Sequence, residues 1–193
     1  MSRYLAAPGS KVSGSSDYID SSDTDSKLVN QFFRFVSDNK DYEVEYLMCD
    51  NILLTTGPRR LANVMCRVVE LWLDGGTKLS RRQSDHMFYA ISQSTDFKLK
   101  KLILRDVTMP NLDAETFASA LINLEEVCLG EAVLSEDHLQ AVFSVIGKKP
   151  KPILKLRKLI FLNHQHLSFL RVCKIMNSAI CGVRILFLYE DNI

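Results

Sequence analysis

The sequence predicts an α/β solenoid, in which short parallel strands alternate with helices, and two observations lead to this prediction. A three-residue apolar motif recurs along the chain. Its copies are Leu47-Met48-Cys49, Leu71-Trp72-Leu73, Leu102-Ile103-Leu104, Val127-Cys128-Leu129, Leu159-Ile160-Phe161 and Leu186-Phe187-Leu188. The first members of successive copies lie 24, 31, 25, 32 and 27 residues apart, so short and long steps alternate. Self-similarity at such a period is typical of a solenoid, here with about six strands.

The segments between the motifs carry helix signals that fit this alternation. The two long repeats have amphipathic helices that begin after Ser80 and Ser135, which are good N-cap residues. The short repeats have briefer predicted helices over 60–66, 113–121 and 169–179. Each repeat is therefore expected to run strand, loop, helix and loop.

The N-terminal segment differs in composition from the repeats. Residues 1–26 contain eight serines and an acidic stretch, and such a composition predicts a disordered tail. Residues 27–38 place apolar side chains at helical spacing, which predicts a helical cap over the open end of the core. The repeat domain, with this cap, is expected to span residues 27–193.

Composition and charge narrow the function classes. The chain has 193 residues, of which 47% are hydrophobic and 24% charged, as expected for one domain with a sizeable core. A net charge of +1 gives no global field that favours nucleic acid or an anionic membrane. Charged residues also interrupt every apolar run before it reaches the length of a membrane span. We therefore expect neither a nucleic-acid nor a membrane partner.

The cysteines indicate the compartment. There are five, an odd number, with no Cys-x-x-Cys spacing, and the N-terminus lacks the apolar region of a secretory signal. Free thiols in a reducing compartment explain this pattern. The predicted location is the cytoplasm, with the nucleus as the alternative.

The two long units resemble each other, since Leu71-Trp72-Leu73 is followed by Leu79-Ser80 much as Val127-Cys128-Leu129 is followed by Leu134-Ser135. Over residues 42–193 the chain resembles the ribonuclease-inhibitor-like class of leucine-rich repeats, although most repeats lack the asparagine usual after the strand. The resemblance implies a curved parallel sheet on the concave side and helices on the convex side. It also implies protein binding, in settings that include enzyme inhibition, innate immunity, ubiquitin ligation and actin capping.

Candidate binding residues follow from strand geometry. Side chains alternate along a strand, so the middle residue of each motif and those two positions away face the concave side. The partner-binding candidates are Tyr46, Met48, Glu70, Trp72, Asp74, Lys101, Ile103, Arg105, Glu126, Lys158, Ile160, Phe187 and Tyr189. The middle positions form an apolar column, predicted to be exposed, and an exposed apolar stripe marks a contact site. The alternatives are that β-propensity and cross-strand charge pairing explain the pattern, or that the N-terminal segment covers this face.

No motif for catalysis or for a cofactor is present. The sequence lacks the glycine-rich nucleotide loops, the serine nucleophile elbow and the zinc-protease helix motif. His164 and His166 stand close together, but Cys173 and Cys181 lie too irregularly to complete a metal site. We predict a non-catalytic interaction module with no catalytic residue, metal or cofactor, and a partner that is another protein.

Two alternatives remain open. Arg59 and Arg60 lie in a predicted early loop, and the GTPase-activating protein for Ran, which is of this same repeat class, has an arginine in an early loop. An arginine supplied to a GTPase can stabilise transition-state charge. The second alternative is a structural subunit, or a fragment of a longer array, that docks or self-associates through an uncapped C-terminal edge at residues 183–189.

Overall fold

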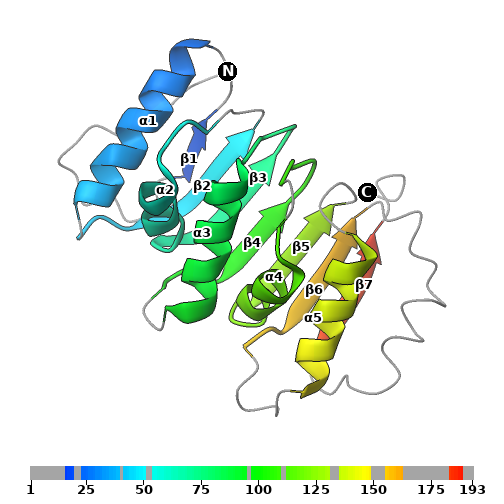
Figure 1. Ribbon diagram of the computed structural model, residues 1–193. Helices are drawn as coiled ribbons and strands as arrows, with labels where there is room; N and C mark the ends of the chain where they lie inside the picture. Colours follow the sequence, from blue (N-terminus) through cyan, green and yellow to red (C-terminus); the bar gives the residue numbers. More distant parts are fainter. Residues whose placement is uncertain are drawn as a thin grey trace.

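A computed structural model describes residues 16–19, 23–39, 41–50, 54–94, 97–109, 112–130, 135–148, 155–162 and 183–188. Within these residues, seven strands form one open parallel sheet whose order in space is the order along the chain (Figure 1). The strands are β1 (Ser16–Ile19), β2 (Val44–Asp50), β3 (Val68–Asp74), β4 (Lys101–Leu104), β5 (Glu126–Gly130), β6 (Lys158–Leu162) and β7 (Arg184–Leu188). The helices are α1 (Asp23–Asp38), α2 (Pro58–Met65), α3 (Arg81–Gln93), α4 (Ala114–Leu121) and α5 (Glu136–Lys148).

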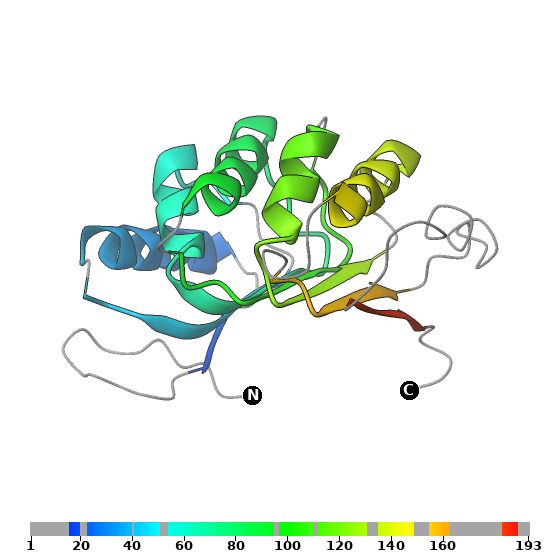
Figure 2. The ribbon, with the colours of Figure 1, turned by 90° about the horizontal axis from the view of Figure 1, so that it is seen from below.

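The described helices all lie on one face of the sheet, as Figure 2 shows. Sequential parallel strands with helices on one side confirm the α/β class and are compatible with a solenoid. The other side of the sheet, which we call the open face, carries no described helix. This face is where the candidate binding residues were predicted.

The main core fills the space between the sheet and the helices. Leu47, Leu71, Leu102 and Leu159 occupy equivalent positions on successive strands, with Val127 among them, and all five are fully buried. The helices contribute fully buried aromatic and aliphatic side chains to the same core. The leucines of the sequence motif therefore play the structural role that their spacing predicts.

Helix lengths alternate as the repeat spacing predicts. The short units carry helices of 8 residues, α2 and α4, and the long units carry helices of 13 residues, α3 and α5. The predicted starts after Ser80 and Ser135 are confirmed, because α3 begins at Arg81 and α5 at Glu136. The helix predicted over 169–179 lies outside the described residues.

In each long unit, the side chain of the third helical residue contacts a backbone carbonyl oxygen of the preceding unit. Gln83 Nε2 donates to the carbonyl oxygens of Leu54 and Thr56 at 2.6 and 2.8 Å. His138 occupies the same position in α5, and its Nε2 lies 3.1 Å from the carbonyl oxygen of Leu112. Both side chains also bond their own N-cap serine, so one residue closes the helix end and joins two repeats.

The N-terminal boundary differs from the prediction of a disordered tail over 1–26. Residues Ser16–Ile19 form β1, which pairs in parallel with β2, and α1 begins at Asp23 rather than at residue 27. The predicted cap at 27–38 is therefore the helix of an additional strand–helix unit. Val29, Phe33 and Val36 place their side chains in the core, as expected for one apolar helix face.

The last described strand is shifted by one residue from its predicted register. Leu186, not Phe187, is the partner of Ile160, whereas Phe187 is the partner of Phe161. Since side chains alternate along a strand, a shift of one residue exchanges the two faces. The prediction that Phe187 belongs to the open-face column is therefore wrong, and Leu186 takes this position. Tyr189 lies outside the described residues.

Candidate functional site

The open face has an apolar cluster at its centre that is separate from the main core. Ile103, Cys128 and Ile160 pack together there, on three neighbouring strands. Trp72 extends the cluster at one end, and Leu162 and Leu186 extend it at the other. We call these six residues the open-face cluster. The cluster is thus a second apolar group, which belongs to the open face.

The centre of the open-face cluster is not exposed, contrary to the prediction of an exposed apolar column. Ile103 is 7% exposed, and Cys128 and Ile160 are each 6% exposed. Burial also raises the pKa of the Cys128 thiol to about 11, with a smaller contribution from the Glu126 carboxylate. The half-buried members Trp72, Leu162 and Leu186 are therefore the ones that can contact a partner.

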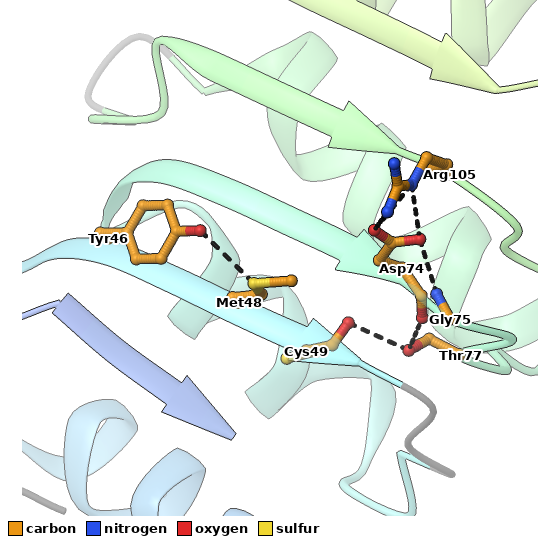
Figure 3. Close-up of polar contacts among 7 residues, drawn as sticks. All are labelled: Tyr46, Met48, Cys49, Asp74, Gly75, Thr77 and Arg105. Atoms are coloured by element: carbon orange, nitrogen blue, oxygen red, sulfur yellow. Dashed lines mark hydrogen bonds and ion pairs between the residues drawn. The ribbon is translucent and has the colours of Figure 1, made fainter. Parts of the chain in front are cut away.

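An aromatic pair occupies the β2–β3 end of the open face. The rings of Tyr46 and Trp72 lie 5.7 Å apart, and Tyr46 Oη is 3.5 Å from the sulfur of Met48 (Figure 3). The indole N–H of Trp72 donates to Glu70 Oε1 at 2.7 Å. Lys101 donates to the same oxygen at 2.8 Å and lies 5.5 Å from the indole centroid. Cation, carboxylate and indole thus hold one another in place.

Glu70 is the acid at the centre of this arrangement. Burial raises the pKa of its carboxyl, but the hydrogen bonds from Lys101 and Trp72 and the charge of Lys101 outweigh burial. The pKa of Glu70 therefore lies below its ordinary value. The carboxylate form is the one that orients Trp72.

Asp74 and Arg105 form a second closed charge pair at the ends of β3 and β4 (Figure 3). Arg105 Nε lies 2.8 Å from one carboxylate oxygen of Asp74, and Nη2 lies 2.8 Å from the same oxygen. The other oxygen accepts from the backbone N–H of Gly75 at 2.7 Å. Asp74 is only 5% exposed, so this pair fixes the loop after β3 more than it offers charge to a partner.

The loop after β3 needs glycine. Gly75 and Gly76 have φ of 59° and 83°, a left-handed conformation that glycine adopts without strain. This turn lets the Thr77 hydroxyl donate to the Cys49 carbonyl oxygen at 3.1 Å on the neighbouring unit (Figure 3). On the other side, a Cβ at Gly130 would come within 3.1 Å of the Arg105 Cα, so a side chain there would crowd Arg105.

The β5–β7 end of the open face is basic. Lys158 pairs with Glu126 at 3.1 Å, which continues the alternation begun by Glu70 and Lys101. Arg184 then follows Lys158 in register, so two cations stand side by side. An open groove of about 510 Å³ extends across the amino ends of β4–β7. Its lining residues are Lys100, Lys101, Glu125, Glu126, Arg157, Lys158 and Arg184.

Sequence reasoning placed most candidates on the correct face but missed the residues that make the groove basic. Arg184 was missed because the register of the last strand was misread. Lys100 and Arg157 were missed because they precede the strands. A signal for Arg184 existed, since Arg184-Ile185-Leu186-Phe187 matches Lys158-Leu159-Ile160-Phe161 in residue type at every position. A charged residue directly before the apolar triplet, as on β3 to β6, therefore marks the register.

The arginines of the GTPase-activating alternative do not lie in a loop. Arg59 and Arg60 are exposed in the first turn of α2, directly after Pro58. Both residues belong to α2, and the described helices lie on the side of the sheet opposite to the open face (Figure 2). The GTPase-activating function itself stays a prediction.

Three further observations concern the chemistry of the described residues. No helix among them is long and apolar enough to cross a membrane. Across the same ranges, no group of three or more histidine, cysteine or acidic residues is placed to hold a metal ion. Cys49, Cys66 and Cys128 are free thiols, while His164, His166, Cys173 and Cys181 lie outside the described ranges.

No protein-family model and no curated protein matches the chain.

Proposed function

We propose that this chain is a non-catalytic interaction module of the ribonuclease-inhibitor-like leucine-rich repeat type, which binds a partner protein on its open face. The open-face cluster carries the proposal. Six apolar residues gather on the side of the sheet that no described helix covers. Three of them, Trp72, Leu162 and Leu186, keep part of their surface exposed beside charged groups. Apolar surface framed by charge is typical of protein interfaces.

Preorganisation supports this proposal. Trp72 is held by a hydrogen bond to Glu70, by contact with the Tyr46 ring and by the Lys101 cation. A side chain that is already fixed loses little conformational entropy when a partner binds. Tryptophan is also among the residues that dominate binding energy at interfaces. The parallel ladder beneath provides a rigid support.

Site-specific photo-crosslinking tests the proposal. A photoreactive phenylalanine analogue replaces Leu162 on the open face in one variant and Tyr89 on α3 in another. Tyr89 is 61% exposed on the helical face and serves as the matched control. In cells of the source organism, we expect a discrete protein adduct from position 162 and none of comparable yield from position 89.

A second variant connects the adduct to the open-face cluster. Trp72→Ala removes the half-buried aromatic anchor, and its circular dichroism spectrum reports whether the fold persists. We expect the adduct at position 162 to be lost in this variant. Adducts that form equally from both positions, or that persist without Trp72, contradict binding on the open face.

A further inference from the structure

We propose that the groove at the amino ends of β4–β7 binds an acidic, extended segment of the partner protein. This inference rests on the proposed function, because the groove borders the open-face cluster. The groove is lined by five cationic and two anionic side chains, a local net charge of +3. The whole chain carries only +1, so positive charge is concentrated at this site.

The surplus charge in the groove is not neutralised within the described residues. Lys158 is paired with Glu126, and Lys101 is paired with Glu70. Among the described residues, by contrast, no carboxylate forms an ion pair with Lys100, Arg157 or Arg184. These three side chains are exposed. They are available to a ligand of opposite charge.

The position of Arg184 is unfavourable without such a ligand. Its register partner on β6 is Lys158, and like charges directly opposite each other destabilise a sheet. An acidic residue at position 184 would instead continue the alternation of Glu70, Lys101, Glu126 and Lys158. A carboxylate from a partner, placed between Lys158 and Arg184, would remove the repulsion. The sheet thus leaves an anion-binding position at its β7 end.

The chemistry of the groove favours a peptide over a polyanion. Glu125 and Glu126 lie among the cations and would repel a continuous phosphate backbone or an anionic lipid surface. Leu186, two residues after Arg184 on β7, presents apolar surface beside the cations. Arginine forks match carboxylates in geometry. A segment that alternates acidic and apolar residues would satisfy both kinds of surface.

The width of the groove sets the length of that segment. Four strands spaced by about 4.8 Å span about 14 Å. An extended chain advances about 3.3 Å per residue, so about five residues cross the groove. Successive side chains of an extended segment point in opposite directions, so its acidic residues can meet the cations on one side.

Fluorescence anisotropy with defined probes tests the proposal. The probe is a labelled peptide about six residues long that alternates glutamate and leucine. The comparison probes are a lysine–leucine peptide of the same pattern, an oligothymidylate and vesicles that contain phosphatidylserine. We expect the glutamate–leucine peptide to bind most tightly, and its affinity to fall with added salt.

Matched charge reversals assign the binding to the groove. Arg157→Glu/Arg184→Glu reverses two exposed groove cations, and Arg59→Glu/Arg60→Glu makes the same charge change on the helical face. We expect the first variant to weaken peptide binding at least about tenfold and the second by less than about twofold. Arg157→Gln/Arg184→Gln provides the same test, with a smaller loss, if charge reversal unfolds the protein.

Three outcomes overturn the proposal. One is the absence of peptide binding, another is an equal effect of the two charge reversals, and the third is tighter binding of the oligothymidylate or the vesicles through the same arginines. If crosslinks from position 162 persist while the acidic peptide fails to bind, the open face is used and only the acidic chemistry is wrong. If both fail, the proposed function itself is wrong.

Discussion

The two ends of the open face use charge in different ways. At the β2–β4 end, Glu70 and Asp74 each bond to a cation, and their remaining hydrogen bonds hold Trp72 and the loop after β3. At the β5–β7 end, one pair is closed while Arg157 and Arg184 add positive charge. The paired charges fix the local conformation, whereas the cations that have no carboxylate partner among the described residues are those to which we assign ligand binding.

The open-face cluster connects these two ends. Cys128 lies at its centre, between Ile103 and Ile160 in register. Cys128 is only 6% exposed, so its reactivity reports whether the cluster is closed.

Cys128 is expected to react very slowly with iodoacetamide. Burial, followed by the charge of Glu126, raises the pKa of the thiol from its ordinary value of 9.0 to about 11. At pH 8, the reactive thiolate is therefore about 100-fold scarcer than for a free cysteine. Site-resolved mass spectrometry measures the rate, which should rise up to a pH of about 11. Alkylation of Cys128 in the native protein at the rate seen in guanidinium would contradict the closed cluster.

Asp74→Ala is expected to destabilise the fold by about 2 kcal/mol, because it leaves the Gly75 N–H and the Arg105 guanidinium without their acceptor. The control is Glu125→Ala at the basic end, where the side chain is exposed. That variant should change the unfolding free energy by less than about 0.5 kcal/mol. Urea unfolding measures both, and equal effects would refute the contrast between the two ends.

Glu70→Gln is expected to lower stability by about 1 kcal/mol at neutral pH. The pKa of Glu70 is lower in the folded than in the unfolded chain, because the hydrogen bonds from Lys101 and Trp72 outweigh burial. Its stabilisation is therefore complete above the unfolded pKa, about 4.3, and is lost as pH falls through the folded pKa. Unfolding curves across this range should show the wild type and the variant converging. A difference that stays constant with pH would contradict this role.

The repeat pattern was sufficient to predict most of the sheet. The apolar triplets placed Leu47, Leu71 and Leu102 correctly because the core requires an apolar residue at the same position of every strand. The repeat pattern failed to predict the register of β7, because the apolar residues from Ile185 to Leu188 allow two registers. β1 was missed because Ser16 and Asp17 carry the composition of a solvated tail.

Exposure on the open face could not be predicted from the strand pattern. Alternation specifies that Ile103 and Ile160 point away from the helices, but not how closely neighbours on adjacent strands approach. Their burial depends on neighbours in the folded chain, which the pattern of a single strand does not specify. The ion pairs were easier to predict than exposure, because opposite charges at equivalent positions of adjacent repeats meet across neighbouring strands.

The free energy of unfolding of Arg184→Glu tests the central claim most directly. Arg184 stands beside Lys158 in register, and no carboxylate among the described residues pairs with it. Glutamate there would pair with Lys158, so the variant should be more stable than the wild type by about 0.5 kcal/mol in low salt, and less so in high salt. A loss of stability on this substitution would contradict the register of β7 and the surplus charge on which the basic groove depends.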